Sequence, residues 1–128
     1  MEAATVRERY EANMDTRTKI VDAGQARLIA AQGATIISGH FDPLVASHAE
    51  RLAELKNEDV PLLVLIATPA DAILPARARA ELVAGLSVVD YVCEAADGVA
   101  PHLSLEREHT ERLAQLIEQV HARQRAAS

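Results

Sequence analysis

Residues 36–52 read IISGHFDPLVASHAERL, and this stretch decides the fold. An apolar run leads into Gly39, a short polar turn holds His40 and Asp42, and a helical pattern that carries His48 follows. A buried strand, a glycine turn and a helix start together form the phosphate-binding geometry of α/β proteins. The stretch therefore predicts an α/β fold with a candidate anion site at this turn.

Strand and helix patterns alternate on both sides of this stretch. Asp22 can cap a helix that Gly33 ends, and Ser104 can cap a long helix near the C-terminus. Alternating strands and helices imply right-handed crossovers and a parallel sheet. We therefore expect a Rossmann-like, three-layer α/β/α fold with a short sheet of three parallel strands. The predicted helices lie at 22–33, 44–57, from Pro75 and from Ser104, and the strands at 34–39, 61–68 and 87–95.

The composition limits the class of protein. The chain has 128 residues, enough for one domain, which we place at 16–128 after a charged N-terminal extension at 1–15. The net charge is −6 with both signs interspersed, which argues against nucleic acid as a partner. Cys93 is the single cysteine, so no intrachain disulfide or cysteine-rich zinc site can form.

Hydropathy along the chain predicts no contact with a membrane. The charged N-terminus has no apolar segment of the kind that secretory signals contain. The longest apolar run, VPLLVLIATPA at 60–70, is far shorter than the ~20 residues that span a bilayer. We therefore expect a soluble cytoplasmic protein.

Two blocks of sequence match one known family. Gly39, Phe41 and Asp42 fit a G-x-F-D motif, and His48 falls at the second histidine of the H-x-G-H motif that follows it. In the second block, RAELVAGLSVVDYV, Arg79 stands at the family's arginine position ahead of an L-x-x-V-D-x-V strand. The chain thus resembles the cytidylyltransferase-like branch of the nucleotidylyltransferase superfamily. The resemblance is closest to domains that activate sugar phosphates such as heptose phosphate, and it covers roughly residues 19–95.

This resemblance implies a truncated nucleotidylyltransferase fold and a set of site residues. His48 would be the catalytic residue. The expected ligand is a nucleotide, CTP or ATP, or a phosphorylated small molecule, and an active enzyme would use Mg²⁺ with the nucleotide triphosphate. By the same resemblance, the nucleotide or phosphate would be bound by Gly39, His40, Phe41, Asp42 and Arg79.

The sequence also departs from the family where phosphate charge is handled. Val45 replaces the first motif histidine and Ser47 replaces the motif glycine. No basic residue stands between the second predicted strand and Arg77, and the C-terminal segment has no serine- and threonine-rich nucleotide-binding motif. Losing one preorganised donor typically costs ~10²–10³ in rate. We therefore expect a catalytically impaired domain that binds its ligand without turnover.

Two other functions remain open at this point. One is an active cytidylyl- or adenylyltransferase with a repaired site, which would use His40, His48 and residues of a second subunit. The other is a non-catalytic structural or protein-interaction module. A homodimer is expected in either case, because a sheet of three strands leaves an edge that must be covered. The long final helix should cover the sheet or meet a partner helix.

Each candidate residue also has an ordinary structural interpretation. His48 can be a partly buried helix histidine, and His40 a loop residue. Asp42 is interpreted first as the cap of the following helix. Arg79 can be solvated helix surface. Asp90 is expected to make a structural contact and Cys93 to be a core residue, while no role is assigned to His102, His109 and His121.

Overall fold

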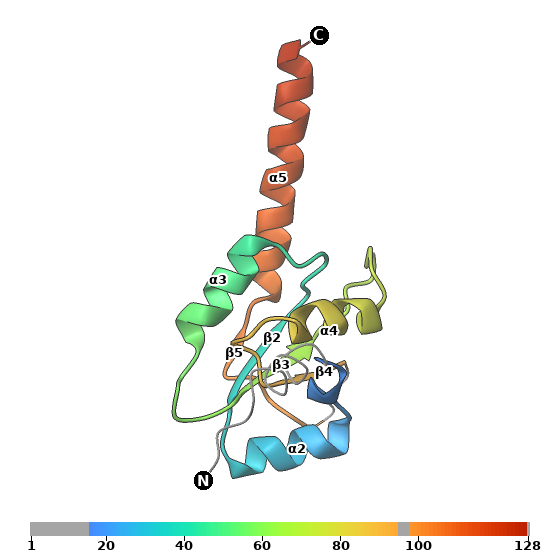
Figure 1. Ribbon diagram of the computed structural model, residues 1–128. Helices are drawn as coiled ribbons and strands as arrows, with labels where there is room; N and C mark the ends of the chain where they lie inside the picture. The colour runs from blue at the N-terminus through green and yellow to red at the C-terminus, as the bar shows by residue number, and fades with distance from the viewer. Residues whose placement is uncertain (1–15, 95–97, 128) are drawn as a thin grey trace, which may run out of the picture.

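The sheet is parallel throughout the part of the chain that the computed structural model describes, which is residues 16–94 and 98–127 without the side chains of residues 112, 113 and 116 (Figure 1). The predicted extension at 1–15 lies outside these residues. Five strands occur in the described part, in the order β1-β4-β3-β2-β5. They are β1 (Ile20–Val21), β2 (Thr35–Gly39), β3 (Leu62–Ile66), β4 (Tyr91–Cys93) and β5 (Leu103–Ser104).

Helices connect and surround these strands, which confirms the expected Rossmann-like, three-layer α/β fold. Asp22 caps α2 by accepting a hydrogen bond from the Gln25 amide, and Gly33 ends the helix, both as predicted. The α4 helix starts after Pro75, also as predicted. The helical elements are η1 (Thr16–Lys19), α2 (Ala23–Gln32), α3 (Ala46–Leu55), α4 (Ala76–Ala84) and α5 (Glu106–Ala127).

The order of the strands creates one topological switch point, between β2 and β5. From β2 the chain adds β3 and then β4 on one side, and β5 then returns to the other side of β2. Ligands of open α/β sheets bind outside the carboxyl ends of the strands at such a point. Here Ser38 pairs with Ser104 in register, and its hydroxyl donates a 2.7 Å hydrogen bond to the Glu106 carboxylate.

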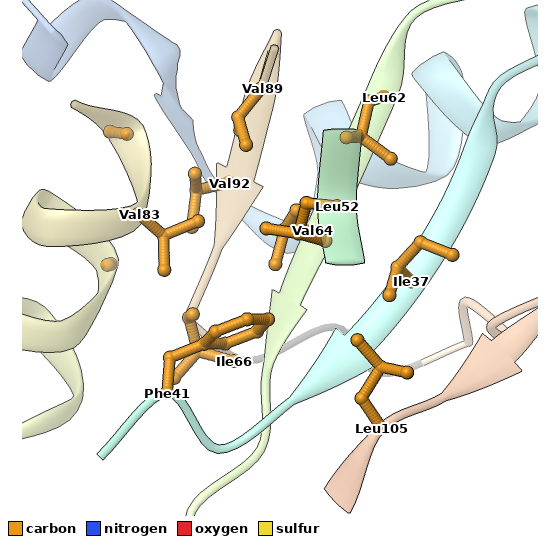
Figure 2. Close-up of a cluster of buried hydrophobic side chains, with 12 residues drawn as sticks. Ile37, Phe41, Leu52, Leu62, Val64, Ile66, Val83, Val89, Val92 and Leu105 are labelled. Carbon is orange, nitrogen blue, oxygen red and sulfur yellow. The ribbon is translucent and has the colours of Figure 1, made fainter. Parts of the chain in front are cut away.

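Two apolar clusters cover the two faces of the sheet. Figure 2 shows the larger one, where Leu52 of α3 and Val83 of α4 pack over Val64 of the central strand β3. On the opposite face, Ala26 of α2 packs with Val99 and with strand side chains that include Ile36 and Leu63. All five residues of β3 are buried, as its continuous apolar sequence predicts for a central parallel strand.

The sequence patterns misjudged both edges of the sheet. Strands β1 and β5 have two residues each, too few to produce a periodic signal, so three strands were expected instead of five. The predicted strand 87–95 is paired only over Tyr91–Cys93. Ser104 belongs to β5 instead of capping the final helix, which begins at Glu106.

Helix α5 does not cover the sheet, which contradicts one of the two expectations for it. Its first turn contacts β2, and the rest of the helix extends away from the body of the molecule (Figure 1). Ile117 and Val120 are about half exposed, at 48% and 52%. Among the described residues, no helix is both long and apolar enough to cross a membrane.

Candidate functional site

A pocket of about 440 Å³ opens at the switch point between β2 and β5. Its walls come from the turn after β2, the start of α3, the loop after β3 and the first half of α5. A volume of this size is within the range of small-molecule sites. The residues that line it are His40, Asp42, Pro43, Val45, His48, Pro69, Asp71, Ile73, His109, Thr110 and Ile117.

Gly39 ends β2 beneath two aromatic rings. A Cβ atom at this position would lie 2.6 Å from Cε1 of His109 and 2.7 Å from Cε2 of Phe41. Phe41 is fully buried in the larger core cluster, and its φ of 48° is the left-handed conformation that a bulky residue rarely adopts. Glycine is therefore required here by the packing of two rings, and neither Gly39 nor Phe41 lines the pocket.

His109 holds the turn in place from the other side of the switch point. Its Nδ1 accepts hydrogen bonds from the backbone N–H groups of His40, at 3.1 Å, and Phe41, at 3.3 Å. Burial, together with the neighbouring His48 and His40, lowers the pKa of His109 to about 3. The ring is therefore neutral, and its proton is on Nε2.

His48 lies directly beside His109. The two ring centroids are 4.1 Å apart, and both residues line the pocket. Nδ1 of His48 accepts a 3.2 Å hydrogen bond from the backbone N–H of Val45, the residue that precedes α3. That nitrogen carries no proton, so a neutral His48 also has its proton on Nε2.

His40 completes a group of three histidines that the sequence did not place together. Its ring centroid is 6.5 Å from that of His109. The three come from three different elements: the turn after β2, α3 and α5. Within the described residues, no three or more metal-binding side chains are arranged to hold a metal ion.

Asp42 fixes the loop that forms the opposite wall of the pocket. Its carboxylate accepts hydrogen bonds from the backbone N–H of Ile73, at 2.6 Å, and of Leu74, at 2.8 Å. The interpretation of Asp42 as the cap of the next helix is therefore wrong, since Val45 occupies that position. The loop has two backbone N–H groups here that need acceptors, those of Ile73 and Leu74, and Asp42 satisfies both.

Arg79 lies behind the pocket, fully buried, and is not among the lining residues. It donates to the carbonyl oxygens of Leu74, at 3.0 Å, His40, at 3.0 Å, and Ala67, at 2.8 Å. A fourth bond, 2.8 Å long, runs to the Thr68 hydroxyl. Arg79 thus joins the loops after β2 and β3, and the solvated-surface interpretation is wrong. Its contact with a ligand phosphate stays a prediction.

The charges in the pocket wall are acidic. Asp42 and Asp71 line the pocket, and among the side chains that the structure describes neither a lysine nor an arginine does so. The polar side chains named in the pocket wall are therefore imidazoles, carboxylates and the Thr110 hydroxyl. A ligand with a large negative charge would meet these two carboxylates.

The structure brings three of the six predicted site residues to the pocket, His40, Asp42 and His48. The residue that sequence reasoning missed is His109. It lies in the first turns of a helix that directly follows a two-residue strand, so only recognition of that strand would have placed it at the switch point. Asp90 makes the expected structural contacts, with Lys56 and the Leu62 amide, and Cys93 is buried. Comparisons with protein-family models and with curated proteins found no match to this chain.

Proposed function

We propose that the switch-point pocket binds the phosphate of a nucleotide or of a phosphorylated metabolite and does not turn it over. The observation that carries this proposal is the pair formed by His48 and His109. Their rings lie 4.1 Å apart, and the Nδ1 of each is occupied by backbone N–H groups.

Two imidazoles held in this way form a preorganised pair of donors. Because each Nδ1 accepts from the backbone, a neutral ring carries its proton on Nε2, where it can be donated to a phosphate oxygen. Burial holds His109 neutral, as its lowered pKa indicates. The resemblance to cytidylyltransferases assigns phosphate contacts to two histidines, and His109 lies beside His48 although Val45 replaces the first of them.

The absence of turnover follows from the charges that nucleotidyl transfer needs. Such a reaction develops negative charge on phosphoryl oxygens, which positively charged side chains or metal ions stabilise. Among the side chains that the structure describes, no lysine or arginine lines the pocket, and Arg79 is bonded to carbonyl oxygens behind it. These observations support binding over catalysis.

The acidic wall also specifies the form of the ligand. Asp42 and Asp71 would repel a bare triphosphate, while Mg²⁺ bound to the phosphates would reduce that repulsion. We therefore expect the nucleotide to bind as its Mg²⁺ complex. Binding should weaken when Mg²⁺ is removed.

Isothermal titration of CTP, and then ATP, into the full chain with Mg²⁺ tests the proposal. The informative variants are His48→Asn and His109→Asn, because asparagine keeps an acceptor near the position of Nδ1 but removes the Nε2–H donor. His121→Asn is the matched control, since His121 is exposed and does not line the pocket. We expect each pocket variant to weaken binding roughly tenfold and the control to bind as the wild type does.

Two results would contradict the proposal. If neither nucleotide gives heat at millimolar concentration, the proposal that the pocket binds a nucleotide is wrong. The protein-interaction module is then favoured. Pyrophosphate release that depends on His48 would favour the active enzyme, which the sequence left open.

A further inference from the structure

Apolar side chains form most of the wall of the switch-point pocket. They come from the turn after β2, the residue before α3, the loop after β3 and helix α5. The proposed phosphate donors do not account for this part of the wall, because an apolar side chain offers no hydrogen bond to a phosphate. The apolar lining residues are Pro43, Val45, Pro69, Ile73 and Ile117.

Val45 is an unfavourable residue for the position that it occupies. It lies immediately before α3, where Ser, Thr, Asp and Asn stabilise a helix by accepting a hydrogen bond from its first amide groups. The valine side chain makes no such bond and instead lines the pocket. Residues that break a local rule in this way are expected at functional sites. Val45 therefore indicates that the apolar wall serves a ligand.

Ile73 is the second unfavourable residue, because it is 65% exposed. Its backbone N–H donates a 2.6 Å hydrogen bond to the Asp42 carboxylate, which also accepts from the Leu74 amide. Two bonds to a charged group thus hold the loop where the Ile73 side chain lines the pocket. Exposed apolar side chains that gather at a concave site mark surfaces that bind ligands.

A nucleobase would be poorly matched by this wall. Proteins hold bases by stacking them on aromatic or arginine side chains and by hydrogen bonds to their edges. Among the described side chains that line the pocket, the only rings besides proline are imidazoles, and none is an asparagine, a glutamine or an arginine. The polar edges of a base and its ribose would therefore lie against prolines, valine and isoleucines, which costs binding energy. A hydrocarbon body has no polar edges to satisfy.

We propose that the switch-point pocket selects a phosphate monoester with a short hydrocarbon body over a nucleotide. This specificity rests on the proposed function, which assigns a phosphate to His48 and His109. A monoester carries fewer negative charges than a nucleoside triphosphate, so Asp42 and Asp71 repel it less. The pocket volume of about 440 Å³ lies toward the lower end of the range for ligand sites, which suits a small molecule.

A series of alkyl phosphates tests this specificity directly, because every member has the same charged group. Methyl, butyl and hexyl phosphate are titrated in turn into the full chain. Each methylene that leaves water should tighten binding about threefold, so three buried methylenes should make hexyl phosphate bind roughly thirtyfold more tightly than methyl phosphate. Hexyl phosphate should also bind more tightly than CTP with Mg²⁺. Equal affinity along the series, or tighter binding of CTP, would overturn the specificity and leave phosphate binding in place.

Two serine variants test whether the apolar wall provides the specificity. Ile73→Ser should weaken the binding of hexyl phosphate about tenfold and leave that of methyl phosphate unchanged. Leu28→Ser is the matched control, because Leu28 is also 65% exposed but lies on α2 and does not line the pocket. Val45→Ser should weaken hexyl phosphate binding about threefold and raise the midpoint of urea unfolding, since serine can cap α3. Unchanged binding of hexyl phosphate in both pocket variants would overturn the proposal.

Hexanol and lipid vesicles separate the possible failures. Hexanol should bind roughly tenfold more weakly than hexyl phosphate, because it lacks the phosphate. If hexanol binds equally well, or if neither the alkyl phosphates nor CTP bind, the proposed function fails and the specificity fails with it. Phosphatidylcholine vesicles that contain phosphatidate should not sediment with the protein. Co-sedimentation would identify the headgroup of a membrane lipid as the ligand and would overturn the assignment to a small molecule.

Discussion

The turn after β2 is held by two buried polar residues that reach it from two different helices. Arg79 of α4 donates to the His40 carbonyl. His109 of α5 accepts from the His40 and Phe41 amides. The two residues therefore satisfy the donors and the acceptor of one short segment, which carries the pocket's first histidine.

The two attachments differ in how they respond to conditions. Arg79 has donors only, and its bonds reach three separate carbonyl groups and a hydroxyl. His109 holds the turn only while its ring is neutral, since protonation of Nδ1 removes the acceptor. The α4 side is thus a permanent attachment, and the α5 side is one that acid can release.

Replacing Arg79 should have the largest effect on stability. Arg79→Met keeps much of the side-chain volume but leaves the carbonyls of Leu74, His40 and Ala67 without their donor. We expect the free energy of unfolding to fall by about 3–5 kcal/mol in urea denaturation. Arg77→Met is the control, because Arg77 is half exposed, and its loss should change stability by less than ~1 kcal/mol. Equal effects of the two variants would contradict the role given to Arg79.

Removing His109 should cost somewhat less. His109→Ala leaves two backbone N–H groups without an acceptor and a cavity beside Phe41, so we expect a loss of about 2–4 kcal/mol. His109→Asn keeps an acceptor for these groups and should cost about half as much. If asparagine destabilises the protein as strongly as alanine does, the hydrogen bonds to the turn contribute little.

The free energy of unfolding should fall as the pH is lowered, because His109 binds a proton more readily in the unfolded chain. Its pKa is about 3 in the folded protein and 6.5 in an unfolded chain. Below pH 6.5 the unfolded state binds a proton that the folded state does not, so the free energy of unfolding falls by up to ~1.4 kcal/mol per pH unit until the pH approaches 3. Relative to His109→Asn, the wild type should lose about 2 kcal/mol of unfolding free energy from pH 7 to pH 5, so its advantage at pH 7 should be gone by pH 5. A constant difference would show that His109 titrates normally.

The smallest effect is expected at the loop that faces the histidines. Asp42→Asn keeps one oxygen for the Ile73 and Leu74 amides, so we expect a loss of about 1 kcal/mol in thermal or urea unfolding. Asp71→Asn removes an exposed charge from the same pocket and should be nearly neutral. A larger loss from Asp71→Asn than from Asp42→Asn would mean that the loop is held by something other than Asp42.

The fold was predictable where the sequence is long and periodic. Asp22, Gly33 and Pro75 mark helix ends by local chemistry, and the continuous apolar run of β3 marks a central strand. Strands β1 and β5 depend on their neighbours in the sheet, because two residues carry no pattern of their own. The exposure of α5 likewise depends on where its first turn is anchored.

The site was predictable only on the β2 side. His40, Asp42 and His48 follow the strand within one segment, so a local pattern includes them. His109 is 61 residues beyond His48 and reaches it through a crossover that no local pattern records. Arg79 was predicted to bind the ligand because of its position in a motif, but it does not line the pocket. A position in a motif does not show what the guanidinium contacts.

Helix α5 is attached to the body of the protein near one end, so a tilt of the helix would move the residues at that end. Its 22 residues extend over ~33 Å, and its contact with β2 is made near its N-terminal end. A force applied at the C-terminal end of α5 would therefore tilt the whole helix about its N-terminal end, which carries His109. Tilting the helix would separate the His109 ring from His48 and from the amides that it accepts.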